Sequence, residues 1–358
     1  MLTIQQLPSS WARFCLDVGK NWQENLPTLH SSHLLLALSG GSDSTALAIL
    51  SSLLKLRLNL TLSACTINHG LRSEACGEVL GVKKLCQNLN IPCETKNFDT
   101  NAYAKIHKIG IEEAARHLRY SCLEEEREKI GADYIATAHQ LDDLAEDMLM
   151  RLIRGAGWPK LAGMPIIDQH RHLIRPLLFT RAKILQEFLQ DLDISWFTDQ
   201  SNFDLSYTRN RIRHTIVPLF LSENPNFPNN VANLWQMAAL DNDFWSIYLD
   251  KLLQTNPLKV IFDQKKATLN LKLDRSWLLE IHPAARLRLY KIIFNKLYSE
   301  SWLYKQNNRQ ECPQISAPKL FQVDKLLQKG IGGKKLTLIN SLTISFVNYM
   351  INFELDIR

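Results

Sequence analysis

The sequence lacks the features that define several broad classes of protein. It has no Cys-x-x-Cys pair, and its seven cysteines are scattered and odd in number, which favours free thiols in a reducing compartment over disulfides or a zinc site. The N-terminal segment shows no basic stretch followed by an apolar core, so no secretory signal is indicated. The uncharged residues 336–353 include seven Thr, Ser and Asn residues and alternate in polarity, which predicts strands rather than a membrane span. We therefore expect a soluble protein without a membrane partner, in the cytoplasm or in the stroma or matrix of an organelle.

Length and charge set wide bounds on the architecture. The 358 residues, 46% of them hydrophobic, predict two or three globular domains. The formal net charge of +6 and the isoelectric point near 8.8 are mildly basic. A balance of this size is only weak support for nucleic-acid binding.

Residues from about 33 to 196 alternate between short apolar strands and helices. Strands are predicted at 33–38, 60–67, 91–98 and 133–138, and helices up to about residue 58, at 74–89, at 111–130 and after 139. In the last of these helices, Ala145, Met148, Leu149 and Leu152 form an apolar stripe. Repeated strand–helix units predict an α/β fold, a mostly parallel sheet with helices on both faces.

Polar clusters follow three of the predicted strands, at residues 39–44, 68–72 and 139–143. In parallel sheets, ligands bind beyond the carboxyl ends of the strands. We therefore expect these three clusters to meet at one edge of the sheet and to form the functional site.

The first cluster is a glycine turn, Ser39-Gly40-Gly41-Ser42-Asp43-Ser44, at the predicted start of a helix. Backbone N–H groups and the helix dipole favour a phosphate at such a position, glycines let the backbone approach it, and the serines add hydroxyl donors. The turn carries no lysine, but Asp43 could ligate a Mg²⁺ that bridges phosphates. The alternative is a tight strand-to-helix turn in which Ser and Asp act as N-caps.

The sequence changes character after about residue 202. A polar segment at 222–230 precedes a region at 231–298 that is rich in Leu, Trp and Ala and is predicted to be helical, and residues 299–315 are predicted to be a loop. The tail from about residue 320 should hold a short helix, the "GIGGKK" segment and a hairpin. We expect a helical N-terminal extension at 1–29, a catalytic domain at 30–220, and a mainly helical C-terminal domain at 221–358 that ends in a β hairpin.

The pattern Ser-Gly-Gly-x-Asp-Ser after a first strand resembles the PP-loop of the N-type ATP pyrophosphatases, whose fold is related to the adenine nucleotide alpha hydrolases. Those enzymes cleave ATP to AMP and pyrophosphate. The resemblance implies that residues Ser39 to Ser44 cradle the leaving pyrophosphate, with ATP as substrate and Mg²⁺ as cofactor.

Further motifs resemble the tRNA(Ile)-lysidine synthetases, in the order found in that family, over about residues 30–220. They are "NHGLR" (68–72), "IEEAARHLRY" (111–120), "TAHQLDD" (137–143), "RLIRGAG" (151–157), "LAGM" (161–164), "RPLL" (175–178) and "WFTDQSNFDLSYTRNRIRHTIVP" (196–218). The resemblance implies a ligase that adenylates the wobble cytidine of tRNA(Ile) with anticodon CAU and lets free lysine displace AMP. The product is lysidine, which reads AUA instead of AUG. The chain resembles a compact form of this family, without a second C-terminal domain.

Asp143 and Glu146 are the candidates for binding lysine. They lie three residues apart at the start of a helix, so their carboxylates share a face. Paired acids there could hold an ammonium group and accept its proton, although acidic residues also favour helix N-termini for electrostatic reasons alone. The resemblance assigns both residues to lysine binding and catalysis.

Arg116 and His139 are the remaining catalytic candidates. From the residues alone, Arg116 is equally a solvated arginine or a partner of Glu112, and His139 is equally structural or catalytic. The resemblance places both at the nucleotide, with Arg116 on an ATP phosphate or on the activated cytidine.

Arginines that could contact tRNA follow in a basic stretch. Arg72 could bind a phosphate, and Arg151, Arg154, Lys160, Arg171, Arg175, Arg181 and Lys183 are joined later by Arg209, Arg211, Arg213 and His214. Scattered arginines usually cover solvated surfaces, but this density, with Trp158 and Trp196 interspersed, fits an RNA footprint. We expect tRNA contacts from Arg72, Arg154, Arg209 and Arg213 and from the C-terminal domain. A homodimer is compatible with the resemblance.

The sequence departs from the family pattern beside the proposed lysine site. Gln140, Leu144 and Asp147 stand where the family usually has His, Gln and Thr.

The sequence leaves three alternative functions open. A tRNA thiolase is one alternative, but such enzymes commonly need closely placed cysteines. A small-molecule amide synthetase is another, but it would not need the arginine-rich stretch. A non-catalytic RNA-binding relative is a third, against which the intact glycine turn argues.

Overall fold

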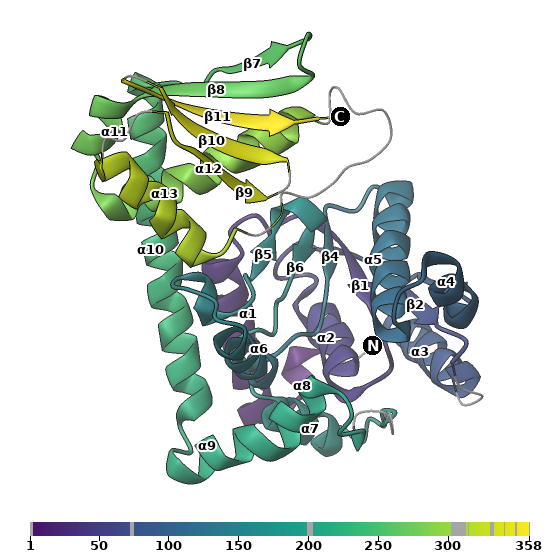
Figure 1. Ribbon diagram of the computed structural model, residues 1–358. Helices are drawn as coiled ribbons and strands as arrows, with labels where there is room; N and C mark the ends of the chain where they lie inside the picture. The colour runs from purple at the N-terminus through teal and green to yellow at the C-terminus, as the bar shows by residue number, and fades with distance from the viewer. Residues whose placement is uncertain are drawn as a thin grey trace. The chain divides into compact units, whose positions relative to one another are not determined.

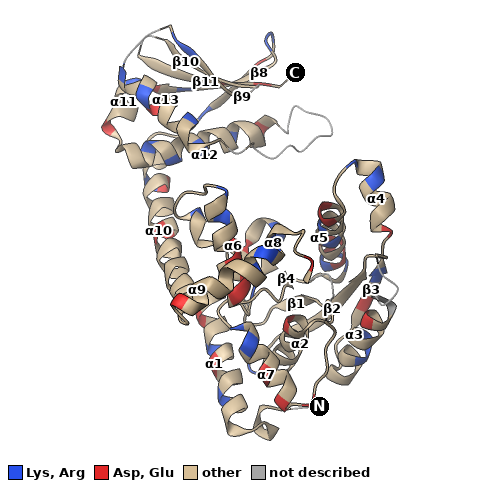
Figure 2. Ribbon diagram, turned by 60° about the horizontal axis from the view of Figure 1, so that its bottom comes forward, with Lys and Arg blue, Asp and Glu red and all other residues tan. Residues whose placement is uncertain are grey.

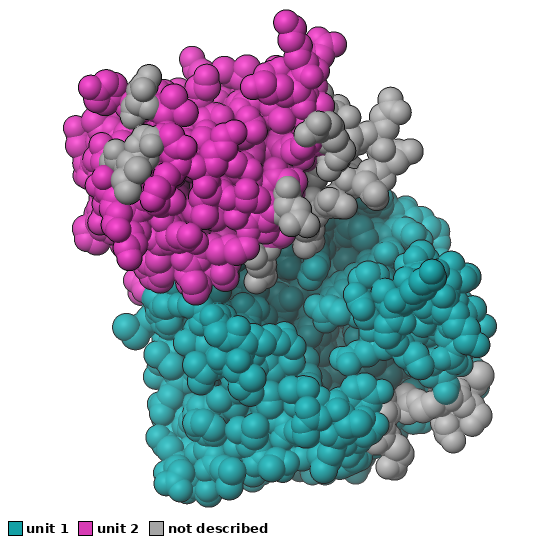
Figure 3. Space-filling view, viewed as in Figure 1, with its two compact units in different colours: residues 1–238 teal, residues 239–358 magenta. Residues whose placement is uncertain are grey.

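The computed structural model describes residues 3–71, 75–198, 203–301, 313, 315–329, 333–339, 341–347 and 349–357. The chain divides into two compact units, residues 1–238 and 239–358 (Figure 3). In the part of the chain that the structure describes, no helix combines the length and the apolar character needed to cross a membrane.

Unit 1 is built on a six-stranded sheet with the order β3-β2-β1-β4-β6-β5 (Figure 1). Its strands are β1 (His33–Ala37), β2 (Thr61–Asn68), β3 (Cys93–Asn97), β4 (Tyr134–Ala136), β5 (Ile167–Asp168) and β6 (Leu173–Ile174). All neighbouring pairs are parallel except β5 with β6. The predicted parallel sheet is therefore confirmed, and the short antiparallel strand β5 at its edge was not predicted.

Helices cover both faces of this sheet, as predicted. They are α1 (Ser9–Asn25), α2 (Ser42–Leu54), α3 (Ala75–Leu89), α4 (Thr100–His107), α5 (Ile111–Ile130), α6 (Leu141–Ile153) and α7 (Ala182–Asp191). Successive side chains of a strand point to opposite faces. Accordingly, Leu34 and Leu36 belong to the main core with α1, α2 and α7, whereas Leu35 packs in a smaller core with Cys122 and Leu123 of α5.

The helix expected within residues 1–29 is α1, and its buried face, which includes Cys15 and Trp22, is part of the main core of unit 1. It lies close against α2 because Gly19 has no side chain: a Cβ at this position would lie 2.8 Å from Leu54 Cδ2. The apolar stripe predicted for α6 holds for Ala145 and Leu149, which are buried, but Leu152 is 56% exposed near the end of the helix.

The cysteines described in full are free thiols, which confirms the interpretation of their spacing. These are Cys15, Cys65, Cys86, Cys93 and Cys122. The side chains at 76 and 312 lie outside the described part of the chain.

Most of the chain from residue 208 to the boundary of unit 1 is helical. It forms α8 (Thr208–Arg211), the π-helix η5 (Ile212–Ile216), α9 (Val217–Glu223) and α10 (Phe227–Thr255). In the described part of the chain, short 3-10 helices include η1 (Ile4–Gln6), η2 (Lys160–Ala162) and η3 (Gln169–Arg171). The boundary between the two units falls inside α10.

Unit 2 combines helices with a five-stranded antiparallel sheet of order β7-β8-β11-β10-β9. After α10 come β7 (Val260–Asp263), β8 (Thr268–Asp274), α11 (Arg275–Glu280), α12 (Pro283–Ser301), α13 (Ala317–Lys329), β9 (Lys335–Ile339), β10 (Leu342–Val347) and β11 (Met350–Asp356). The terminal hairpin β10–β11 is confirmed. The helical prediction is wrong at 260–274, where β7 and β8 form a hairpin whose Leu269, Leu271 and Leu273 enter the core. Most of the loop predicted at 299–315 lies outside the described residues.

A buried ion pair joins α12 to α13 in the core of unit 2. Arg286, which is 3% exposed, donates from Nε to Asp324 Oδ1 at 2.6 Å and from Nη2 to Asp324 Oδ2 at 2.9 Å. The Tyr290 hydroxyl donates to the same carboxylate at 3.2 Å. Two parallel N–H bonds of this kind fix both distance and angle, so the pair sets how the two helices pack.

Candidate active site

The glycine turn connects β1 to α2, as predicted. Gly40 adopts φ +84°, a conformation that L side chains rarely adopt. Gly41 is the N-cap residue of α2 and provides no side-chain cap. Ser44 Oγ instead donates to the Gly41 carbonyl at 3.0 Å, and Ser39 Oγ donates to Ser44 Oγ at 3.2 Å. The alternative in which Ser or Asp caps this helix is therefore not what the structure shows, and the N–H groups of its first turn remain available for an anion.

Phe197, which is far from the turn in sequence and was not predicted as a site residue, also contacts the turn. The backbone N–H of Phe197 donates to the Gly40 carbonyl at 2.9 Å. The Phe197 ring also covers Gly81 of α3, where a Cβ would lie 2.3 Å from ring atom Cε2. No local spacing links residues 40, 81 and 197, so sequence reasoning could not identify this contact.

Asp43 lies in the first turn of α2, where Ser42 Oγ donates to its carboxylate at 3.3 Å. Burial, together with the smaller effect of the nearby negative charge of Asp143, raises the pKa of Asp43 to about 7. Among the described residues, no group of three or more His, Cys, Asp or Glu side chains could hold a metal ion by itself. One or two carboxylates together with substrate phosphates is the usual ligand set of Mg²⁺, and Asp43 fits it.

Asp143 and Glu146 lie on one face of α6, as their spacing predicted, and they are 8% and 2% exposed. Asp143 is also part of a capping box: its Oδ2 accepts a hydrogen bond from the Gln140 N–H at 3.1 Å, while the Gln140 side chain caps the helix. The preference of acids for helix N-termini thus accounts for part of the role of Asp143. It does not account for Glu146, one turn further along.

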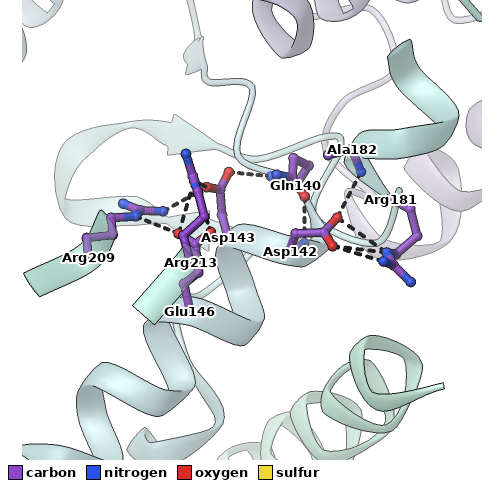
Figure 4. Close-up of polar contacts among 8 residues, drawn as sticks. All are labelled: Gln140, Asp142, Asp143, Glu146, Arg181, Ala182, Arg209 and Arg213. Atoms are coloured by element: carbon purple, nitrogen blue, oxygen red, sulfur yellow. Dashed lines mark hydrogen bonds and ion pairs between the residues drawn. The ribbon is translucent and has the colours of Figure 1, made fainter. Parts of the chain in front are cut away.

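Two arginines from α8 and η5 pair with both acids (Figure 4). Arg209 places Nη2 2.8 Å from Asp143 Oδ1 and Nε 2.8 Å from Glu146 Oε2. Arg213 places Nη2 2.9 Å from Asp143 Oδ1 and Nε 2.6 Å from Glu146 Oε1. The same arrangement shows in the charge distribution as basic residues on α8 beside acidic residues on α6 (Figure 2). Sequence reasoning assigned both arginines to tRNA, and it did not predict that they contact these acids.

The local fold explains why the two arginines reach α6 together. They are four residues apart and therefore share one helix face. Ile212 and Val217 are buried against Leu149 of α6, which holds the segment in place. The segment includes the π-helix η5, a form that occurs mostly at functional sites.

Asp142 anchors the same end of α6 to α7. Its carboxylate lies 3.1 Å from Arg181 Nη2 and accepts the Ala182 backbone N–H at 2.9 Å (Figure 4). The acidic cluster at 142–146 is thus held by three arginines, and it is an organised site rather than a solvated surface.

His139 follows β4 and lies beside this cluster. Its Nδ1 is 2.9 Å from Thr137 Oγ1. Burial lowers the pKa of His139 to about 4, an effect that the positive charge of Arg175 reinforces and the negative charge of Asp143 opposes. The imidazole is therefore neutral near pH 7 and can donate or accept a hydrogen bond there without adding positive charge.

The other candidate residues are not all part of this cluster. Arg116 is exposed on α5; it makes no ion pair with Glu112 or any other described residue, and its guanidinium instead lies over the Tyr120 ring, 5.0 Å from the centroid. Arg154 ends α6, about 16 Å from Asp143 at ~1.5 Å per residue. Arg72 lies outside the described residues.

The three departures from the family pattern have structural roles. Gln140 is the N-cap of α6. Leu144 is fully buried and lies so close to Gly163 that a Cβ there would be 2.5 Å from Leu144 Cδ1. Asp147 pairs with Arg151 at 2.7 Å. None of the three takes a place in the ion-pair cluster of Asp143 and Glu146.

Comparison with known proteins identifies relatives of both the domain and the longer chain. A family model described as a PP-loop domain matches residues 16–220. The chain is 39% identical over 283 residues to the tRNA(Ile)-lysidine synthase of Nitratidesulfovibrio vulgaris, covering 76% of this chain and 82% of that protein. It is 41% identical over 217 residues to the tRNA(Ile)-lysidine synthase of Thermosipho africanus, covering 60% of this chain and 50% of that protein.

Among solved structures, a U34-tRNA thiolase of Methanococcus maripaludis is similar with a TM-score of 0.53 and 18% identity, covering 63% of this chain and 78% of that one. At this level of identity the similarity concerns the fold alone. It agrees with the parallel sheet and flanking helices described above.

Proposed function

Because the chain belongs to the tRNA(Ile)-lysidine synthase family of PP-loop proteins, we propose that it uses ATP to join lysine to C2 of the wobble cytidine of tRNA(Ile) with anticodon CAU. The cytidine oxygen first attacks the α-phosphorus of ATP, forming an adenylated cytidine and releasing pyrophosphate. The lysine side-chain amine then attacks C2 and displaces AMP, leaving lysidine. The observation that carries this proposal is the pair of acids on α6 beside a helix N-terminus suited to phosphates.

The turn from Ser39 to Ser44 suits the pyrophosphate end of ATP. The N-terminus of α2 offers backbone N–H donors, and the serine hydroxyls add further donors. The described part of the turn carries no cationic side chain of its own, so the increase of negative charge on the leaving pyrophosphate calls for a cation from elsewhere. Mg²⁺ bound by Asp43 would neutralise this charge and orient the phosphates.

Asp143 and Glu146 suit the amine of free lysine. Both are almost fully buried, and their ion pairs with Arg209 and Arg213 hold the two carboxylates close together. An ammonium group can take the place of one guanidinium at these carboxylates, and a carboxylate there can take the proton that the amine must lose before it attacks. Neutral His139, next to these acids, can hydrogen-bond to the nucleotide without repelling the lysine cation.

The test is to incubate the purified protein with ATP, Mg²⁺, isotope-labelled lysine and a transcript of tRNA(Ile) with anticodon CAU. Digestion to nucleosides and mass spectrometry should reveal a cytidine heavier by lysine minus water. The matched controls are the same transcript with uridine at the wobble position and the Asp43→Ala variant, neither of which should yield the product. Pyrophosphate release without a lysine-modified nucleoside would refute lysine as the substrate while leaving the ATP chemistry in place.

A further inference from the structure

A cavity of about 500 Å³ lies at α5, and neither the turn of residues 39–44 nor the acids Asp143 and Glu146 line it. It is formed between α4, α5 and η3. The residues that line it and matter here are Tyr103, Glu113, Arg116, His117, Tyr120 and Arg171, and we call it the Tyr120 pocket. Its volume lies within the ~300–1,000 Å³ range of small-molecule sites, so it can hold more than a phosphate ion.

Two guanidinium groups lie over the aromatic ring that gives the pocket its name. Arg116 Cζ is 5.0 Å and Arg171 Cζ is 5.4 Å from the centroid of the Tyr120 ring. A tyrosine ring and guanidinium planes are the surfaces on which proteins stack unpaired RNA bases. Glu113 and His117 on the same wall add polar groups that can bond to the edge of a base.

The positive charges of the two arginines are only partly paired with carboxylates of the protein. Arg116 makes no ion pair with a described residue. Arg171 makes one ion pair, to Asp168 at 4.0 Å, and its side chain is 47% exposed. Two guanidiniums with this much unused donor capacity are suited to contact a phosphodiester.

We propose that the Tyr120 pocket binds the nucleotide next to the wobble cytidine in the tRNA substrate, with its base against Tyr120 and its phosphate on Arg116 and Arg171. This inference rests on the proposed function and adds a specific contact to it. The ligand chemistry is that of a nucleoside phosphate, and we assign it to RNA rather than to ATP. The phosphates of ATP have their own site at α2, whereas the pocket is open to solvent at Glu113, Arg116 and His117, as a nucleotide whose chain continues on both sides requires.

The position of the pocket agrees with a neighbouring nucleotide. Helix α5 runs from the carboxyl edge of the sheet back to the start of the parallel strand β4, and Arg116 lies in the first half of this helix, so the pocket lies towards the edge where the turn of residues 39–44 is found. A cytidine at that edge and a nucleotide in the pocket would then both leave the base stack, which is how proteins commonly read unpaired loops.

The first experiment compares steady-state kinetics of Tyr120→Leu, Tyr120→Phe and Arg171→Gln with the wild type. Tyr120→Leu should raise the KM for tRNA about tenfold, as expected for the loss of one base–aromatic stack, with the KM for ATP unchanged. Tyr120→Phe keeps the ring and should restore most of the loss. Arg171→Gln should reduce the slope of log affinity against log salt by about 0.7. Arg57→Gln, an exposed arginine in the turn between α2 and β2, is the charge-matched control and should change none of these values.

The second experiment identifies the nucleotide. Transcripts with an abasic residue on the 5′ or the 3′ side of the wobble cytidine are assayed with wild type and Tyr120→Leu. At the position that occupies the pocket, the abasic change should weaken the wild type about tenfold and leave Tyr120→Leu unaffected. Additive effects at both positions would overturn the proposal, and so would a rise in the KM for ATP instead of tRNA.

Failure of this proposal is distinct from failure of the proposed function. If the wild type forms no lysidine, the proposed function is refuted, and the affinity of each variant for the transcript then tests the pocket directly by fluorescence anisotropy. Arg171 is exposed, so its replacement tests the pocket even if Tyr120→Leu impairs folding. Equal RNA affinity of wild type, Arg171→Gln and Arg57→Gln would overturn the proposal.

Discussion

Replacing Asp43 by Asn should stabilise the ligand-free protein at pH 8 even though it removes a carboxylate that the proposed ATP chemistry uses. In the folded protein the pKa of Asp43 is about 7, against an ordinary value of 3.8. Between these values the unfolded chain has lost a proton that the folded chain keeps. The contribution of protonated Asp43 to the free energy of unfolding is therefore fully present below about pH 4 and is lost as the pH rises through 7.

The magnitude follows from the two pKa values. A difference of about three corresponds to about 4 kcal/mol at pH 8. Asp43 is not fully buried, so solvent screening reduces this, and we expect the Asn variant to be more stable by about 2 kcal/mol at pH 8 and by about 1 kcal/mol at pH 5. Asparagine keeps the size of the side chain and removes only the charge.

The measurement is urea denaturation of wild type and Asp43→Asn between pH 5 and pH 8 without Mg²⁺. Asp17→Asn, on the exposed face of α1, is the control and should show no pH-dependent difference. If the stabilities of wild type and Asp43→Asn change in parallel with pH, the carboxylate is not disfavoured by its surroundings, and the reasoning about the site is refuted.

Three further predictions concern other residues. Glu146→Gln should raise the KM for lysine far more than the KM for ATP in steady-state kinetics, and an equal rise in both would make Glu146 a structural residue. The pKa of His139 is lowered from 6.5 to about 4, so the contribution of the neutral imidazole to stability is present above pH 6.5 and is lost as the pH falls towards 4. His139→Gln should therefore make the free energy of unfolding depend less on pH in this range. An unchanged dependence would contradict the burial of the imidazole. Arg286→Met leaves the Asp324 carboxylate buried without its partner and should cost about 3–5 kcal/mol in chemical denaturation. The double variant Arg286→Met/Asp324→Leu should recover most of that loss, and a single variant as stable as wild type would show that the pair does not join α12 to α13.

The parts of the fold and site that could be predicted are those with a local signal. The turn at Ser39–Ser44 was predicted because an apolar strand ends where glycines and hydroxyls begin. Asp143 and Glu146 could be placed on one face because a spacing of three residues fixes this in any helix. The hairpin at the end of unit 2 was predicted from strict alternation of polar and apolar residues.

The parts that could not be predicted depend on contacts between distant segments. Arg209 meets Glu146 across 63 positions of the chain, and spacing within one helix does not say which acid lies opposite. The Tyr120 pocket likewise joins α4, α5 and η3. The hairpin of β7 and β8 did carry a signal, the alternating Leu269, Leu271 and Leu273, but the surrounding Leu- and Trp-rich sequence favoured a helical interpretation.

If lysine binds at Asp143 and Glu146 as proposed, the four ion pairs between α6 and the segment of Arg209 and Arg213 make its binding an exchange of one cation for another. An incoming amine would take the place of a guanidinium, so its measured binding free energy is the difference between the amine–carboxylate and the guanidinium–carboxylate interactions. The carboxylates have already lost their water on folding, so binding does not include that cost. The displaced guanidinium is itself a phosphate ligand. Under the proposed function, we therefore expect an RNA phosphate that holds Arg209 or Arg213 to strengthen lysine binding, and by thermodynamic reciprocity lysine should strengthen RNA binding by the same factor.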